Sequence, residues 1–365
     1  MRRWFLSVDW LTLGLAVSLM IFGIAMIDSL TAGRVEHGLA INQTLFGLGG
    51  LGVAFALSVT SYRTIRILSL PLFGLGLMLL LLVLVIGTTV YGATRWIDVA
   101  GVQFQPSELM KPILVLVLAH LLATPDRTWQ TYAGIGLVSL FVLGSVVRQP
   151  DLGTAAVLGL TALGLLAAAR LPIRAWLVAG GTLALLVPFG LTQLTDYQRA
   201  RLETLFQPTA DPLGAGYNVI QSLIAIGNGG LLGQGIGQGT QGQLDFVPVV
   251  HTDFIFAGIA ESVGFVGSVI LITLFFGLII RTYWIAYRIP DHFGSLLCTG
   301  IATLWLVQVV INIGMNLGVA PVTGIPLPFV SYGGTALVAN CLALGLVLSV
   351  GMRLRQSEVG DFATA

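Results

Sequence analysis

The sequence has few charged side chains. Lysine, arginine, aspartate and glutamate make up 9% of its 365 residues, whereas 56% are hydrophobic. A soluble domain typically carries about 25% charged residues, so this shortage, with a mean hydropathy of +0.94, excludes an ordinary soluble fold. The formal net charge is only +1. The charges are also scattered along the chain, so the sequence offers no basic surface for nucleic acid.

Cysteine is equally scarce. Cys298 and Cys341 both lie inside apolar runs and have neither the spacing of a metal site nor that of a redox motif. We interpret both as small core side chains. The histidines are dispersed along the chain and predict no metal cluster.

Long apolar runs dominate instead. A transmembrane helix needs about 20 apolar residues, so the chain has room for about ten spans joined by short loops. The run that follows Arg2 and Arg3 is too long for the apolar part of a signal peptide, so we expect it to be the first span. The expected spans are 8–30, 39–60, 67–90, 109–123, 132–147, 154–169, 175–194, 254–280, 295–319 and 332–352.

These runs predict an all-α integral membrane protein, with residues 1–365 forming a single polytopic domain. An even number of spans places both termini on one side, and basic residues mark the cytoplasmic side. The face that carries the termini is therefore cytoplasmic, because it holds Arg2, Arg3, Arg63, Arg66, Arg127, Arg170, Arg174, Arg281, Arg288, Arg353 and Arg355. The outer face collects most acidic residues: Asp98, Glu108, Asp151, Asp196, Glu203, Asp211, Asp245 and Asp253.

Residues 195–252 form the longest polar segment and are predicted to be a large extracytoplasmic loop between spans seven and eight. Loops of this length usually act as lids or binding elements. Within it, residues 216–227 carry an apolar stripe at helical spacing, which predicts a short amphipathic helix at the membrane interface. Residues 229–242 include seven glycines, so we expect irregular backbone that can approach a ligand closely.

Lys111 is the only lysine in the chain, and it follows Glu108 by three residues. Pro106 is typical of a first helical turn, and side chains three apart share one helix face, so we expect Glu108 and Lys111 to lie together. A charge buried in hydrocarbon is costly unless it is paired or faces water. The pair either holds helices together or lines a polar cavity, in which Lys111 or Arg95 offsets phosphate charge.

Asp253 stands where the long loop enters the eighth expected span. A carboxylate there would stabilise a helix N-terminus, which is the simpler interpretation. Glu261 follows about two helical turns deeper on a similar face, where capping does not explain a carboxylate. A partly dry pocket makes a carboxylate more basic, so Asp253 is also suited to act as a general base.

Two other segments place prolines at span junctions. Arg148-Gln149-Pro150-Asp151 sets a basic and an acidic residue beside a proline on the outer side, which alone is a weak signal. Residues 315–334 contain three prolines and several glycines between two spans. Irregular backbone at membrane depth is tolerated only where protein or a water-filled cavity covers it, so the apolar character of this segment predicts a re-entrant loop.

Several longer motifs occur in a fixed order along the chain. They are Arg95-Trp96-Ile97, Phe104-Gln105-Pro106-Ser107-Glu108 with Lys111, Gln149-Pro150-Asp151-Leu152-Gly153-Thr154, Tyr217-Asn218-Val219-Ile220-Gln221-Ser222 with Ala225-Ile226-Gly227, Gly239-Thr240-Gln241, His251-Thr252-Asp253-Phe254-Ile255-Phe256-Ala257 and Gly324-Ile325-Pro326-Leu327-Pro328-Phe329-Val330-Ser331-Tyr332-Gly333-Gly334. Over essentially its whole length the chain resembles the SEDS glycosyltransferases. It is more similar to their RodA branch, which serves cell elongation, than to the FtsW branch, which serves division.

The resemblance implies a ten-span fold that polymerises lipid II, an undecaprenyl-diphosphate-linked disaccharide pentapeptide, outside the bacterial cytoplasmic membrane. A class B penicillin-binding protein is the implied crosslinking partner. Asp253 corresponds to the essential aspartate of the family, and Glu108 with Lys111 to its polar pair. The other residues expected to bind substrate or line the cavity are Arg95, Gln105, Ser107, Arg148, Asp151, His251, Thr252 and Ser331. Many relatives carry glutamates at the positions of Val249 and Ser262, so those carboxylates are dispensable here.

The implied reaction is one inversion, from an α-linked donor to a β-1,4 product, so a single base suffices. Asp253 would take the proton from the acceptor's 4-hydroxyl group, while Lys111, Arg95 or Arg148, or a magnesium or manganese ion, offsets the diphosphate charge. A carrier that flips lipid II is the main alternative, because a polar cavity suits it equally. The carboxylates and the long loop gather on one side, whereas a carrier would place such groups near the midplane.

Overall fold

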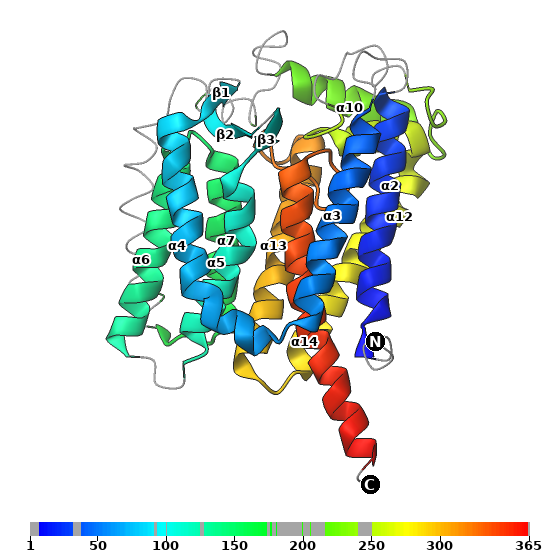
Figure 1. Ribbon diagram of the computed structural model, residues 1–365. Helices are drawn as coiled ribbons and strands as arrows, with labels where there is room; N and C mark the ends of the chain where they lie inside the picture. Colours follow the sequence, from blue (N-terminus) through cyan, green and yellow to red (C-terminus); the bar gives the residue numbers. More distant parts are fainter. Residues whose placement is uncertain are drawn as a thin grey trace.

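The computed structural model describes residues 7–31, 38–90, 93–99, 101–124, 128–173, 216–239 and 250–363, together with residues 176, 180, 199 and 205. The long helices stand side by side as a bundle, and the shorter elements gather at one end of it (Figure 1). We call this end the upper end, after its place in Figure 1. The first turn of α2 and the last turn of α14 both lie at the lower end.

Most of the expected spans are helices. The long helices are α2 (Trp10–Thr31), α3 (Leu39–Val59), α4 (Tyr62–Ile86), α5 (Pro106–Leu122), α6 (Trp129–Val147), α7 (Leu152–Ala168), α12 (Ile255–Arg288), α13 (His292–Asn316) and α14 (Gly334–Ala363). Seven helices of the described residues are long and apolar enough to cross a membrane. The chain is therefore a multi-span membrane protein.

The count of ten spans stays a prediction. Helices α5 and α7 have 17 residues each, which is at the short end of the range of about 17–25 residues for a transmembrane helix. The expected span 175–194 falls almost entirely outside the described residues. The assignment of the lower end to the cytoplasm likewise stays a prediction.

The expectation of an all-α chain is wrong at the upper end. Strands β1 (Thr88–Val90), β2 (Ala93–Val99) and β3 (Val102–Phe104) form a three-stranded antiparallel sheet in the order β1-β2-β3. The expected span 67–90 thus stops at Ile86, and Gly87 ends the helix in an extended conformation. The residues beyond it are rich in threonine and valine, whose branched side chains favour strands.

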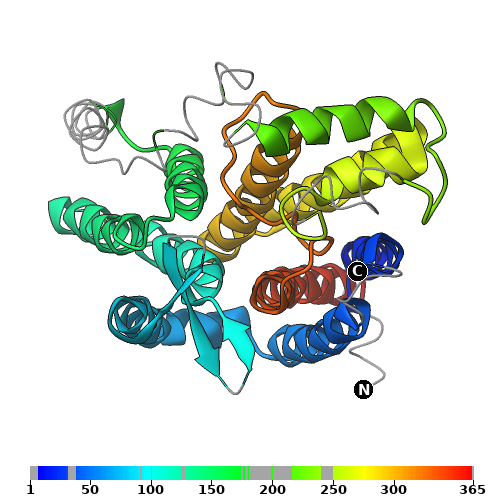
Figure 2. The ribbon, with the colours of Figure 1, turned by 90° about the horizontal axis from the view of Figure 1, so that it is seen from above.

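The predicted amphipathic helix is α10 (Tyr217–Gly229), which lies across the upper end beside α12 (Figures 1 and 2). The glycine-rich segment after it has positive φ angles at Gly230, Gly233 and Gly235. This segment lies against α12, and its approach to a ligand stays a prediction. Helix α12 is interrupted at Gly264 (φ 67°), and residues 230–235 supply substitute backbone partners: Gln234 N donates to Glu261 O at 2.9 Å and Phe265 N to Gly230 O at 2.9 Å.

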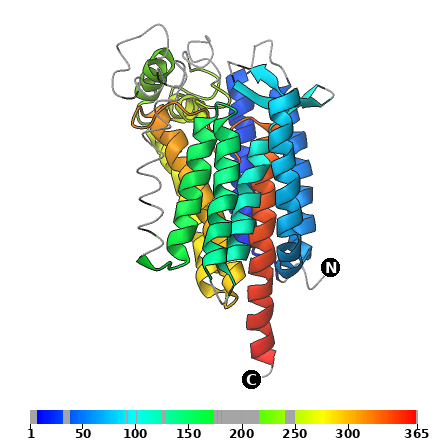
Figure 3. The same ribbon diagram turned by 90° about the vertical axis from the view of Figure 1, so that its left-hand side faces the viewer.

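The centre of the bundle is formed by α5, α13 and α14, as the views from above and from the side show (Figures 2 and 3). In the apolar stretch of α14, 83% of the residues are buried inside the protein, against 17% in α6. Helix α6 is therefore a peripheral helix whose apolar surface faces lipid. Cys298 and Cys341 are free and buried in this core, which confirms their interpretation as core side chains.

Candidate functional site

Asp253 lies in the turn that leads into α12 at the upper end of the bundle. The N-cap of α12 is Phe254, without a side-chain cap hydrogen bond, so Asp253 lies one residue before the cap position. Its backbone carbonyl accepts hydrogen bonds from Asn312 Nδ2 at 3.0 Å and Asn316 Nδ2 at 3.2 Å. Asn316 Oδ1 in turn accepts from Ala257 N at 3.1 Å. The last turns of α13 thus fix the backbone on both sides of the α12 start.

Residues 317–333, the α13–α14 loop, fold back into the bundle as the apolar sequence of this segment predicts. The ring of Phe329 packs 5.6 Å from that of Trp305, which is buried in the middle of α13. Val330 lies so close to Gly23 of α2 that a Cβ atom added at Gly23 would overlap the backbone of Val330. Residues 325–331 of this loop are largely buried in protein, which is the condition for irregular backbone at membrane depth.

The α13–α14 loop joins the Asp253 turn to the rest of the upper end. Ser331 Oγ donates to Thr252 O at 2.7 Å, and Tyr332 N donates to His251 O at 2.9 Å. The rings of His251 and Tyr332 pack edge to face at 5.8 Å. Ser331 Oγ also accepts from Leu327 N at 2.8 Å, so the hydroxyl group of Ser331 holds two backbone segments together.

Glu108 and Lys111 form an ion pair on the first turns of α5, with Lys111 Nζ 2.6 Å from Glu108 Oε1. Their side chains are only 3% and 2% exposed. Two polar atoms beside the pair, Ser107 Oγ and Glu108 Oε2, are buried without a hydrogen-bond partner among the described residues. Buried polar atoms are nearly always satisfied by protein or water, so each of these two atoms needs a partner that the described residues do not supply.

A second charged cluster connects β2, α5 and α7. Arg95 Nη1 lies 3.4 Å from Asp151 Oδ1, and Gln105 Nε2 donates to Asp151 Oδ2 at 3.4 Å. Asp151 is also the N-cap of α7, since its Oδ1 accepts from Thr154 N at 3.1 Å. The backbone N–H of Gln105 donates to Thr335 Oγ1 at 3.3 Å, which links this cluster to the start of α14.

The structure thus brings most of the predicted site residues to one end of the bundle. They form three groups there: the Asp253 turn with the α13–α14 loop, the pair of Glu108 and Lys111, and the cluster around Asp151. Hydrogen bonds through Ser331 link the α13–α14 loop to the Asp253 turn, and Thr335 at the start of α14 links to Gln105. Arg148 differs, because it is the exposed C-terminal cap of α6 and its side chain forms no hydrogen bond or ion pair with the described residues of these groups. In the sequence, Arg148 and Asp151 belong to one motif, and spacing along the chain does not show which of the two side chains faces the bundle.

A divalent cation would find little support from protein ligands in this part of the chain. No three His, Cys, Asp or Glu side chains of the described residues gather as metal ligands would. Asp151 and Glu108 are each engaged by a basic side chain. A magnesium ion here would have to rely largely on substrate phosphates, which is how proteins commonly hold it.

Three site residues escaped the sequence analysis. Asn312 and Asn316 hold the Asp253 turn, and buried Gln43 of α3 clamps the α13–α14 loop by donating to Ser331 O at 2.9 Å and accepting from Gly333 N at 3.2 Å. Each is an amide inside an apolar span, and all are buried. A buried amide needs hydrogen-bond partners. An amide side chain inside an apolar span was therefore the signal that the sequence offered for these three residues.

The chain matches the cell cycle protein family model FtsW/RodA/SpoVE over residues 3–356. It is 44% identical over 279 residues to the peptidoglycan glycosyltransferase MrdB of Escherichia coli K12, and the aligned region covers 75% of each chain. It is 36% identical over 360 residues to the probable peptidoglycan glycosyltransferase FtsW of Geobacter sulfurreducens, covering 95% of this chain and 96% of the relative.

Solved structures agree with these relatives. One is a chain of a peptidoglycan synthase complex that coordinates polymerization and crosslinking, with 39% identity, a TM-score of 0.79 and coverage of 96% of this chain and 99% of that chain. Another is the rod shape determining protein RodA of Thermus thermophilus, with 34% identity, a TM-score of 0.71 and coverage of 94% and 96%. With its fold, its motifs and these relatives in agreement, the chain belongs to the FtsW/RodA/SpoVE family of membrane proteins.

Proposed function

We propose that this chain is a peptidoglycan glycosyltransferase that polymerises lipid II into β-1,4 glycan strands. The relatives named above carry this activity in their names. The observation that carries the proposal is the Asp253 turn, held by two asparagines and by the re-entrant α13–α14 loop at one end of a multi-span bundle. So much support for a single turn is what an accurately positioned catalytic group requires.

In the proposed reaction Asp253 is the general base. Its carboxylate accepts the proton of the acceptor sugar's 4-hydroxyl group while that oxygen attacks the anomeric carbon of the donor. The bond between this carbon and the phosphate oxygen breaks, and the diphosphate leaves with its negative charge. One displacement inverts the configuration from α to β, so no covalent intermediate on the protein is needed.

The basic residues divide into two roles. Lys111 is fully buried and paired with Glu108, so we assign this pair to shaping the interior next to Ser107. Arg95 is 14% exposed and its partner Asp151 is 3.4 Å away, which leaves guanidinium donors for the departing diphosphate. Arg148 is exposed at the surface and is assigned no part in the reaction.

The upper end faces the outside of the bacterial cytoplasmic membrane in this proposal, with both termini in the cytoplasm. The positive-inside rule supports this orientation, because Arg63, Arg66, Arg281 and Arg288 all belong to the lower end. Lipid II reaches the site sideways between helices. A class B penicillin-binding protein crosslinks the product, in line with the complex of polymerization and crosslinking that one structural relative represents.

The test is polymer formation from labelled lipid II by the purified full-length chain. We expect Asp253→Asn to abolish polymer on a gel while the protein elutes and melts like wild type. Asp98→Asn is the matched control, since Asp98 is an exposed carboxylate at the same end whose Oδ1 accepts from Gly101 N at 2.9 Å. Undiminished polymer with Asp253→Asn, or lipid II crossing vesicles without any polymer, would overturn the assignment.

A further inference from the structure

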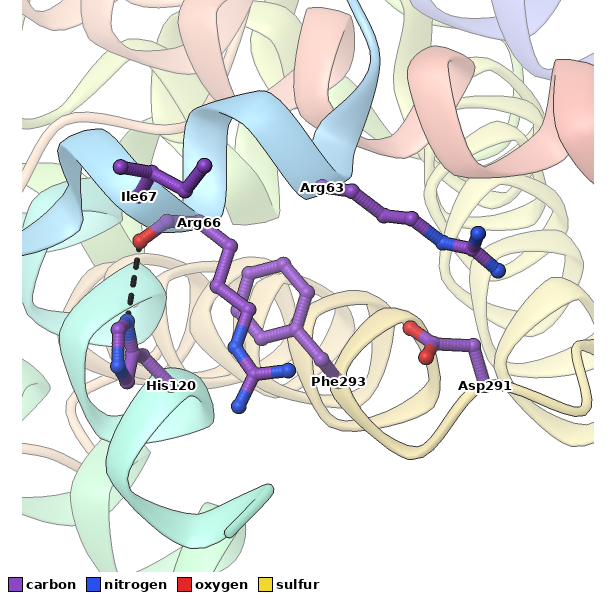
Figure 4. Close-up of a pocket in the computed structure, with 6 residues that line it drawn as sticks. All are labelled: Arg63, Arg66, Ile67, His120, Asp291 and Phe293. Atoms are coloured by element: carbon purple, nitrogen blue, oxygen red, sulfur yellow. Dashed lines mark hydrogen bonds between the residues drawn. The ribbon is translucent and has the colours of Figure 1, made fainter.

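A pocket of about 410 Å³ lies at the lower end of the bundle, opposite the site described above (Figure 4). It opens between the first turns of α4, the end of α5 and the start of α13. Pockets that hold small ligands usually measure about 300–1,000 Å³. Its lining is Arg63, Arg66, Ile67, His120, Asp291 and Phe293, a set that the proposed polymerase reaction does not use.

The pocket carries an excess of positive charge. Neither Arg63 nor Arg66 forms an ion pair with a carboxylate of the described residues. Asp291, the single acidic residue in the lining, is engaged as the N-cap of α13, where its Oδ2 accepts from Gly294 N at 2.8 Å. Two guanidinium groups against one committed carboxylate leave the pocket with affinity for an anion.

Arg66 is held in place for such an anion. Its guanidinium carbon lies 5.2 Å from the centre of the Phe293 ring, and this buried ring stacks on Tyr62 with centroids 6.2 Å apart. A cation over a ring uses its flat face, so the N–H groups at its edge remain directed outward. A planar guanidinium with its edge exposed matches the paired oxygens of a phosphate group.

His120 adds a third polar group to the pocket, beside the backbone of Arg66 and on the side away from Arg63 and Asp291. Its Nδ1 lies 2.7 Å from Ser69 Oγ and 3.0 Å from the carbonyl oxygen of Arg66, which fixes the ring. Nε2 forms no hydrogen bond within the described part of the chain. Figure 4 shows the His120 ring beside the backbone of Arg66, to which a hydrogen bond joins it.

The same pocket has an apolar side. Ile67 lines it and is 74% exposed, and Leu70, one turn further along α4, is 50% exposed. Pro71 follows inside the helix, where it removes a backbone hydrogen bond and bends α4 (Figure 1). A charged opening beside an exposed apolar surface suits a molecule with an anionic head and an apolar tail.

We propose that this pocket binds the phosphate group of an anionic membrane lipid, whose acyl chains lie over Ile67 and Leu70. Basic pockets between transmembrane helices on the cytoplasmic side hold lipid headgroups in this way. The arginines supply bidentate contacts to the phosphate oxygens, and Asp291 limits how much negative charge the pocket accepts. The site does not depend on the proposed polymerase reaction, but it rests on the proposed orientation, with which it places an anionic lipid in the inner leaflet.

The test measures lipid binding to the purified full chain by native mass spectrometry, with phosphatidylglycerol and phosphatidylcholine of identical acyl chains as probes. We expect phosphatidylglycerol to bind more tightly. Arg66→Gln should weaken its affinity by about fivefold, and Arg63→Gln with Arg66→Gln by more. Arg288→Gln, which removes an exposed arginine from the same end outside the pocket, should leave the affinity unchanged.

Four results would overturn the proposal. They are equal binding of the two lipids, equal losses for Arg66→Gln and Arg288→Gln, displacement of the lipid by an equal concentration of inorganic phosphate, and an unchanged affinity in a folded Arg66→Lys variant. This last variant keeps the charge and removes the bidentate edge, so it provides the test if Arg66→Gln fails to fold. Asp253→Asn should bind phosphatidylglycerol like wild type, which separates failure here from failure of the polymerase assignment.

Discussion

The carboxylate of Asp253 packs directly against Gly324 of the α13–α14 loop. A Cβ atom added at Gly324 would lie 3.3 Å from Asp253 Oδ2, and this glycine has a φ angle of 69°. Both features disfavour a side chain at this point. The loop therefore sets the position of the proposed general base through the close approach of its backbone.

Gly324→Ala should reduce polymer formation at least tenfold, because the new methyl group pushes against the carboxylate of Asp253. The positive φ adds about 1–2 kcal/mol of strain. Gly318→Ala is the control, since Gly318 has nearly the same φ (70°) and its Cβ would meet only Val219 and Leu223 at ordinary distances. Equal activity of the two variants in the lipid II assay would contradict the proposed role of this contact.

Asn316→Ala should lower both stability and activity, because the side chain of Asn316 joins Asp253 O to Ala257 N. Loss of a buried hydrogen-bond partner costs about 1–3 kcal/mol. Gln308→Met on the same helix is the control: Gln308 is buried, and its side-chain amide has no partner among the described residues. We expect the melting temperature of the Gln308→Met variant in detergent to match or exceed that of wild type. A larger loss with Gln308→Met than with Asn316→Ala would refute this account.

The sequence predicted the long helices well because a span is a local property, set by the length of an apolar run. Helices α2 and α3 therefore lie within two residues of the expected spans. The sheet formed by β1, β2 and β3 was missed because strands of three to seven residues fall below the length at which apolar runs stand out. Their pairing satisfies backbone groups where the helix α4 ends.

In the candidate site, too, local contacts could be predicted from the sequence and contacts between distant segments could not. The pair of Glu108 and Lys111 was predictable, since helical spacing alone brings residues three apart together. Contacts such as Gln43 with Ser331, 288 positions apart, depend on which helices are neighbours. Nothing in the apolar pattern of a span specifies its neighbours, so Gln43, Asn312 and Asn316 could be recognised only once the bundle was known.

Lys111→Met should destabilise the fold strongly, because it leaves the carboxylate of Glu108 buried without its partner. Breaking a buried ion pair on one side typically costs about 3–5 kcal/mol. The double variant Glu108→Gln with Lys111→Met should recover much of this loss, since no buried charge remains. Melting temperatures in detergent provide the measurement. Additive losses in the double variant would show that the two side chains do not act as a pair.

Asp151 offers a way to separate charge from helix capping in the second cluster. Asp151→Asn keeps a side-chain oxygen for Thr154 N, so α7 retains its cap, but it loses the ion pair with Arg95. We expect a several-fold loss of polymerisation together with a loss of stability of up to about 3–5 kcal/mol, because Asp151 is buried and Arg95 loses its charged partner. Asp151→Ala removes both functions and should add about 1 kcal/mol of destabilisation. If both variants lost stability equally and kept full activity, the cluster would be a structural element, and Arg95 would have no role in offsetting the diphosphate charge.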